Sequence, residues 1–412
     1  MPIFREIPPT AGFPIHPADF LSLLRRKHGA DCLEQDFREY HAVAYAGVAT
    51  SGTAAFYLIL EALKEISGRK TVVIPSYICP LIPLAIKRAG LNIEICDINR
   101  QDFNFNRQDL ERIFSVNTDI LAIVAVHLAG IPLEIDYLVS LARGKGVFVI
   151  EDCAQSLGAV YKGKKAGTWG DFAFFSLCRG KGLTIYEGGL VIASRKDYGA
   201  IVEKKIRALL KNSYLAEGLK ILELFGYAVF YRPLLFWFVF RLPQLFWHWQ
   251  GDDARAMIEY FDIDFPLYGV SSLRKAMGHA AFWRLEDAIS LQRKQAAYYL
   301  SRLAGIEGVK VIAGPTEGKA VYPYLTLLFA DPKKQEKARC LFKGLGLGVS
   351  VIYLSSITDY GYLKPILPQK ILPNARYLAE RAITLPTGEF LREKEQERII
   401  DIIKNILRPG QI

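Results

Sequence analysis

The sequence has few of the residues that build metal sites or disulfide frameworks. It holds six cysteines and six histidines in 412 residues, with no CxxC pair and no histidine pair at ligand spacing. We therefore predict no metal and expect free, mostly buried thiols in a reducing compartment. The first residues lack the basic and apolar regions of a signal peptide, which favours a cytoplasmic protein.

The chain also lacks low-complexity tracts and any recognisable nucleic-acid-binding motif. Its formal net charge of +10 suits an anionic partner, but the lysines and arginines are scattered along the chain. We therefore expect no nucleic acid, and consider a phosphorylated substrate or a membrane surface instead. A length of 412 residues with 51% hydrophobic residues is typical of a globular protein of two or three domains.

Residues 146–192 combine the side chains that a reactive cofactor needs. The apolar run 147–150 fits a strand buried on both faces, and Glu151 and Asp152 follow at its carboxyl end, which faces the ligand crevice in open α/β sheets. A second apolar run leads to Ser176, and Lys181 follows in a loop with glycines.

An acid, a hydroxyl and a lysine in this order are what pyridoxal 5'-phosphate (PLP) requires. A lysine forms a Schiff base with its aldehyde, an acid keeps its pyridine nitrogen protonated, and hydroxyls and backbone amides hold its phosphate. Each residue alone has a plainer interpretation, since loop lysines are usually solvated and an acid at a strand end is often a cap or turn residue. The combination favours PLP.

Several stretches also lie in the order and at the spacing found in one enzyme family. They are SGTAAFYLILEAL (51–63), VVIPSYICPLIPLAIKRAGLNIEICDIN (72–99), VAVHLAGIPLEID (124–136), EDCAQSLGA (151–159), KKAGTWGD (164–171) and FFSLCRGKGLTIYEGG (174–189). On these motifs the chain resembles the sugar aminotransferases of the DegT/DnrJ/StrS type, which are fold-type I PLP enzymes. The resemblance is strong over roughly residues 40–200 and looser from Phe265 onward.

The resemblance implies roles for numbered residues. Lys181 would be the Schiff-base lysine and the acid–base group, Asp152 would pair with the pyridine nitrogen, and Gln155 would lie near the ring hydroxyl. The cofactor phosphate would be held by Gly52, Thr53 and Ser176, although an ordinary helix cap is the plainer interpretation of Ser51-Gly52-Thr53.

The motifs leave the roles of three further residues open. Where the family places an aromatic ring on the pyridine ring, this chain has Cys79. Tyr77 is the nearest aromatic, so the resemblance implies that Tyr77 binds the cofactor by stacking on that ring. His127 ends a predicted strand on the cofactor side, so a structural role and an active-site role both stay open.

The chain departs from the family near the expected substrate. Leu267 and Gly269 stand where the family usually has an Asn and an Arg before its long linking helix. Ile352-Tyr353 replaces a His-Tyr pair near the family's substrate. These departures leave the cofactor chemistry in place and leave the substrate open.

The predicted fold class is α/β, a fold-type I PLP transferase. We expect a large, doubly wound, mostly parallel sheet domain and a smaller C-terminal α+β domain. Apolar runs predict four of the sheet's strands at Ala42–Ala49, Thr71–Pro75, Asn92–Cys96 and Ile120–Val126. Residues 1–260 would form an N-terminal arm and the PLP-binding domain, with an aromatic-rich insertion at about 215–252. Residues 261–412 would form a linking helix, expected at 266–300, and the small domain.

The insertion includes an unusual segment from Tyr227 to Trp249, with three of the chain's five tryptophans. Arg232, Pro233, Arg241 and Pro243 interrupt it, which argues against a transmembrane helix. Clustered aromatics with basic flanks suit the membrane–water interface, so peripheral contact with the inner face of the membrane is one interpretation. A buried insertion or a subunit interface is the other.

The function implied by the resemblance is a transaminase reaction. Glutamate or glutamine would load the cofactor with an amino group, and a keto group on a nucleotide-activated sugar would receive it. The alternatives are an aminotransferase for a lipid-linked or apolar ketone, another PLP chemistry such as a dehydratase, and a non-enzymatic binding protein. Lys181 argues against the dehydratase, in which family members replace the lysine. By analogy with the family we also expect a homodimer.

Overall fold

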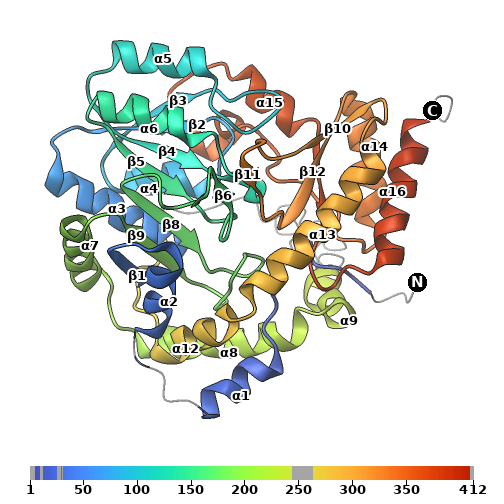
Figure 1. Cartoon of the computed structure of the whole chain (residues 1–412), viewed down its shortest axis with the longest axis horizontal. Helices are drawn as coiled ribbons and strands as arrows, with labels where there is room; N and C mark the ends of the chain where they lie inside the picture. Colours follow the sequence, from blue (N-terminus) through green and yellow to red (C-terminus); the bar gives the residue numbers. More distant parts are fainter. Residues whose placement is uncertain (1–4, 10–12, 26–28, 30, 244–262, 409–412) are drawn as a thin grey trace.

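The computed structural model describes residues 5–9, 13–25, 29, 31–243 and 263–408. A seven-stranded sheet lies at its centre, with helices against it and a smaller C-terminal part beside it (Figure 1). The sheet order is β1-β9-β8-β5-β4-β2-β3, and within this sheet β9 alone runs against the direction of the other strands, pairing antiparallel with β1 and β8. The α/β fold and its mostly parallel sheet agree with the prediction.

The strands of the central sheet coincide closely with the apolar runs of the sequence. They are β1 (Tyr45–Ala49), β2 (Thr71–Pro75), β3 (Asn92–Cys96), β4 (Ile120–Val126), β5 (Phe148–Asp152), β8 (Phe172–Ser176) and β9 (Gly189–Ala193). Every residue of β2, β4 and β9 is buried, as expected of strands covered on both faces. The strand expected from Ala42 begins later, at Tyr45, because Ala42 adopts a left-handed conformation (φ 52°) that ends the preceding helix.

Amphipathic helices connect and cover these strands. They are α2 (Cys32–His41), α3 (Gly52–Ile66), α4 (Leu81–Arg88), α5 (Arg107–Val116), α6 (Ile135–Gly144) and α7 (Lys196–Leu209), with a short 3₁₀ turn η1 (Leu128–Gly130). A small antiparallel sheet joins β6 (Val160–Tyr161), β7 (Lys164–Lys165) and β11 (Gly318–Lys319). Most of α3 is buried, including nine of its side chains or backbone positions from Gly52 to Leu63.

The C-terminal part is built on a second antiparallel sheet. Its strands are β10 (Val309–Ile312), β12 (Tyr324–Phe329) and β13 (Ala382–Pro386), in the order β10-β12-β13. Its helices are α14 (Pro332–Lys343), α15 (Pro373–Ala379) and α16 (Glu393–Leu407), with 3₁₀ turns η3 (Ile357–Asp359) and η4 (Gly361–Leu363). The exact domain limits at 260 and 261 stay a prediction.

The linking helix expected at 266–300 is two helices. α12 (Ser272–Phe282) and α13 (Leu285–Leu303) are separated at Trp283 and Arg284. The Arg284 guanidinium donates to Asp19 (2.5 Å) and to the Pro14 carbonyl (3.1 Å), so this joint is fixed against the N-terminal segment.

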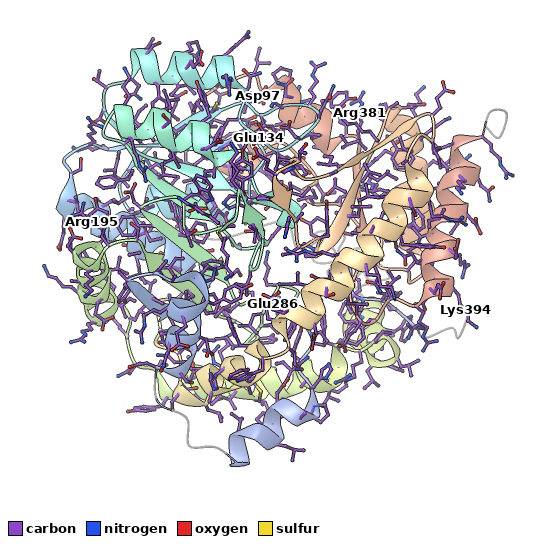
Figure 2. All side chains as sticks on the ribbon, in the orientation of Figure 1. Asp97, Glu134, Arg195, Glu286, Arg381 and Lys394 are labelled. Carbon is purple, nitrogen blue, oxygen red and sulfur yellow. The ribbon has the colours of Figure 1, made fainter. Side chains whose placement is uncertain are left out.

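A buried carboxylate joins the two parts of the molecule. Asp97, labelled in Figure 2, follows β3 and accepts hydrogen bonds from the Ser76 hydroxyl (2.8 Å) and from the backbone amides of Asn374 and Ala375 (3.2 and 3.3 Å). Those two amides lie in the first turn of α15, where a negative charge is favoured. The contact fixes the C-terminal part against the sheet.

The remaining helices lie along one edge of the molecule (Figure 1). They are α1 (Pro17–Arg25), α8 (Tyr214–Phe230), α9 (Pro233–Phe236) and the π-helical turn η2 (Trp237–Arg241). No single described helix has the length and apolar composition of a bilayer span. The pair Tyr214–Phe230 and Pro233–Phe240 reaches that composition only when taken together, across a bend of 109°.

Candidate active site

A cavity of about 660 Å³ opens at the carboxyl ends of β4, β5 and β8. This is the edge at which open α/β sheets bind their ligands. The predicted residues that line it are Gly52, Thr53, Asp152, Gln155, Ser176 and Lys181. They come from separate segments between residues 52 and 181, and the sheet topology brings them together.

One corner of the cavity is suited to an anion. Gly52 and Thr53 form the first turn of α3, where Ser51 caps the Ala54 amide (3.1 Å). Among the described contacts, the amides of Gly52 and Thr53 have no protein acceptor, so they and the helix dipole favour a negative group. A Cβ on Gly52 would come within 3.1 Å of the Ser176 Cβ, so the glycine lets this hydroxyl approach the helix end.

The acid and the lysine lie on the same cavity. Asp152 ends β5, is 6% exposed and accepts the Ala154 amide (3.0 Å). Burial raises the pKa of its carboxyl to about 6, while the Ala154 amide, Lys181 and His127 oppose that shift. A cationic ring nitrogen would stabilise the ionised form further. Lys181 is held through its backbone, since its amide donates to Cys178 and its carbonyl accepts from Phe13 (3.2 and 3.1 Å).

Gln155 links the central sheet to the C-terminal part. Its Oε1 accepts the Ala129 amide (2.8 Å) and the Tyr324 hydroxyl (2.6 Å). Because both bonds occupy the oxygen, the side-chain NH₂ is left as the donor to a ring hydroxyl. Tyr324, the first residue of β12, also lines the cavity, so this hydrogen bond joins β12 to the site.

The expectation for Tyr77 is corrected by its position. Its ring is 2% exposed and is not among the residues that line the cavity. Its hydroxyl donates to the Tyr353 carbonyl (2.9 Å) and accepts the Tyr353 amide (3.2 Å), which turns the ring into the core. Cys79 and Tyr353 line the cavity in its place, together with Ile352.

His127 lines the cavity and belongs to a buried network beneath Asp152. Its Nδ1 accepts the Leu133 amide (3.0 Å), so its Nε2 carries the proton that it donates to Glu151 (2.9 Å). Glu151 accepts three further backbone amides, from Gly167, Trp169 and Gly170 (2.7 Å each).

His127, Glu151 and Cys153 lie close enough together to hold a metal ion. Both nitrogens of the histidine and both oxygens of the carboxylate already have hydrogen-bond partners, so the group is explained without one. The network instead fixes the end of β5 that carries Asp152.

The cavity is also lined by charged and aromatic residues for which the sequence predicted no role. The Arg179 guanidinium donates to the Tyr186 hydroxyl (3.0 Å), and Tyr186 has a left-handed backbone (φ 73°), which is rare for an aromatic residue. Lys220 pairs with Glu187 (2.6 Å) and with Glu223 (2.9 Å). Lys220 and Glu223 belong to α8, so the insertion contributes to the site. No motif signalled this, because the insertion lies outside the quoted stretches.

The comparison with known families follows this geometry. The model of the DegT/DnrJ/EryC1/StrS aminotransferase family matches residues 24–217 and 268–404. The chain belongs to this family. The family is PLP-dependent, and the chain is a PLP-dependent aminotransferase by membership. The unmatched stretch 218–267 covers most of α8 and the segment that follows it, and the insertion at about 215–252 stays a prediction.

Similar proteins act on nucleotide sugars. One is UDP-4-amino-4,6-dideoxy-N-acetyl-beta-L-altrosamine transaminase of Campylobacter jejuni, 25% identical over 92% of this chain and 89% of that protein. Another is the GDP-perosamine synthase of Escherichia coli O157:H7, 37% identical over 40% of this chain and 44% of that protein. The putative sugar aminotransferase Spr1654 of Streptococcus pneumoniae, solved in its PLP form, has the same fold, with a TM-score of 0.76 at 18% identity over 98% of each chain.

The cavity fits the cofactor of this family. The free amides at the start of α3 and the Ser176 hydroxyl suit a phosphate, and the close approach of Ser176 to Gly52 leaves little room for a larger residue there. The acid at the end of β5 and Lys181 supply the two groups that PLP needs on opposite parts of its ring.

Proposed function

We propose that this protein transfers an amino group from glutamate or glutamine to a keto group of a nucleotide-activated sugar. One observation carries the proposal: Asp152, Lys181, Ser176 and the first turn of α3 line the same cavity. The names of similar proteins support a sugar nucleotide as the acceptor.

Bound PLP would supply an electron sink for the negative charge that develops on the carbon bearing the amino group. Lys181 would hold the cofactor covalently and move the proton to and from that carbon. Asp152 would keep a proton on the pyridine nitrogen. Ser176, Gly52 and Thr53 would hold the phosphate, and Gln155 would donate to the ring hydroxyl through its NH₂ group.

Side chains that line the cavity outside the predicted cofactor site would select the substrate. Arg179 offers positive charge at the cavity, as a diphosphate requires, whereas Glu187 and Glu223 balance the charge of Lys220. Ile352 and Tyr353 present an apolar and aromatic wall where relatives of the family have a His-Tyr pair. An acceptor with an apolar or lipid-linked part is therefore the second candidate.

The test is transfer of labelled nitrogen. The purified protein with PLP is incubated with ¹⁵N-glutamate or amide-labelled glutamine and a panel of keto-sugar nucleotides, and products are identified by mass spectrometry. The proposal predicts a ¹⁵N-amino sugar with at least one acceptor. A protein that takes nitrogen from neither donor, yet binds PLP at Lys181, would contradict the proposed donors.

A further inference from the structure

Helix α8 has two unlike faces. Glu217 and Lys220 are turned toward the molecule, whereas the Glu223 side chain is 42% exposed. Glu217 accepts two hydrogen bonds from the nearly buried Arg274 (2.6 Å each) and another from the Ser271 amide (2.9 Å). Lys220 pairs with Glu187 and Glu223, and both Lys220 and Glu223 line the cavity. The charged residues of α8 are Glu217, Lys220 and Glu223.

The outer face of α8 is apolar and exposed. Leu215, Leu219, Leu222 and Val229 follow the spacing of one helix face and are 79%, 54%, 67% and 52% exposed. Tyr214, Phe225 and Phe230 add further exposed rings. An ordinary surface helix turns its charges to water and its apolar stripe to the core. In α8, Leu224 and Tyr227 are buried in the core, but most of the solvent-facing side is apolar as well.

The apolar surface continues beyond the end of α8. Leu234 of α9 is 57% exposed, and Phe238 and Val239 of η2 are 46% and 49% exposed. Figure 1 shows α8 and α9 at the same edge of the molecule as α1, where Phe20 stacks on Phe225 (ring centroids 4.8 Å apart). Exposed apolar residues gathered on neighbouring helices in this way mark an interaction site. We call it the α8–α9 surface.

We propose that the α8–α9 surface docks the protein onto an anionic membrane surface, beside the mouth of the cavity. Helices with a wide apolar face and basic flanks lie in the headgroup region of bilayers. Here Lys204, Arg207 and Lys211 are exposed on the approach to α8, although Lys204 and Arg207 also pair with Glu65 and Glu203. The chain carries a net charge of +10, which complements anionic lipids.

The arrangement of acids favours a lipid partner. Glu217 is turned to Arg274 and Glu223 to Lys220, so neither acid is unpaired where headgroup phosphates would lie. Tyr214–Phe230 and Pro233–Phe240 reach the composition of a membrane segment only as a bent pair, which suits a segment lying in the interface rather than one crossing the bilayer. The part of Tyr227–Trp249 beyond residue 243 lies outside the described residues.

Docking would hold the cavity near the headgroups, because α8 contributes both to the cavity lining and to the docking surface. An acceptor carried on a lipid could then enter the cavity without leaving the membrane surface. Entry of a lipid-carried acceptor rests on the proposed function, whereas docking to the membrane does not. Binding to vesicles can therefore be measured independently of amino transfer.

The experiment is vesicle flotation of the full chain, loaded with PLP. Vesicles of phosphatidylcholine alone are compared with vesicles that also contain phosphatidylglycerol. The double variant Leu219→Glu/Leu222→Glu changes two exposed residues of the α8–α9 surface. Its matched control, Leu341→Glu/Ile371→Glu, makes the same change of charge at exposed residues elsewhere.

We expect the unchanged chain and the control to float with the anionic vesicles. The double variant should lose about tenfold or more of this binding and keep its PLP absorbance. The proposal is overturned if the unchanged chain does not float, if the double variant floats equally well, or if neutral vesicles bind it as strongly. Light scattering gives one more outcome that overturns the proposal. If the unchanged chain is a dimer that does not bind vesicles, and the double variant is a monomer, the α8–α9 surface is the interface with a second copy.

Discussion

Replacing Asp152 by Asn should stabilise the cofactor-free protein while abolishing its activity. The folded protein raises the pKa of this carboxyl from 3.8 to about 6, mainly through burial. Each pKa unit corresponds to about 1.4 kcal/mol, so the ionised carboxylate costs about 3 kcal/mol of folding free energy. Asn removes this cost and keeps an oxygen for the Ala154 amide.

The pH dependence gives the sign of the effect. Between 3.8 and about 6 the folded state holds a proton that the unfolded state releases, so stability increases as the pH falls through this window. The free energy of unfolding of the Asp152→Asn variant should therefore exceed that of the unchanged protein by about 3 kcal/mol near pH 8. This difference should shrink to nearly zero near pH 4.

The assay is denaturant unfolding of both proteins without cofactor across this pH range. Asp136→Asn is the control, because Lys162 lowers the pKa of the Asp136 carboxyl and its removal should not stabilise the protein. A difference in the free energy of unfolding between Asp152→Asn and the unchanged protein that stays the same at every pH would refute the reasoning.

Three further substitutions test the site. Gly52→Ala should weaken PLP binding about tenfold, because its Cβ would crowd Ser176, whereas Gly68→Ala, with open space around it, should not; fluorescence titration with PLP measures both. Glu151→Gln should cost about 2–3 kcal/mol in denaturant unfolding, because its NH₂ group would face backbone donors, and an unchanged midpoint would contradict the network. Tyr77→Phe should cost about 1–2 kcal/mol of stability yet leave PLP absorbance intact, and lost absorbance would return Tyr77 to the cofactor site.

The central sheet could be predicted because its signals are local. The apolar runs at Thr71–Pro75, Asn92–Cys96 and Ile120–Val126 became strands with the expected limits. The positions of Asp152 and Ser176 followed from the same pattern, since each ends a buried strand on the ligand side of the sheet.

The parts that the sequence did not predict depend on contacts between distant segments. Tyr77 is turned away from the cavity by its two hydrogen bonds to Tyr353, which lies 276 positions later. The break at Trp283–Arg284 accompanies contacts from Arg284 to the N-terminal segment. Lys220 reaches the cavity from an insertion whose composition alone left a membrane, a core and a subunit interface open.

The most direct test of the central claim is the visible absorption spectrum of the protein with PLP, recorded with and without glutamate. The account predicts a yellow protein that bleaches when glutamate is added, and a Lys181→Ala variant that never becomes yellow. Borohydride reduction followed by peptide mapping should place the cofactor on Lys181. A colourless protein, or a Lys181→Ala variant that bleaches like the unchanged chain, would contradict the assignment of Lys181 and with it the proposed reaction.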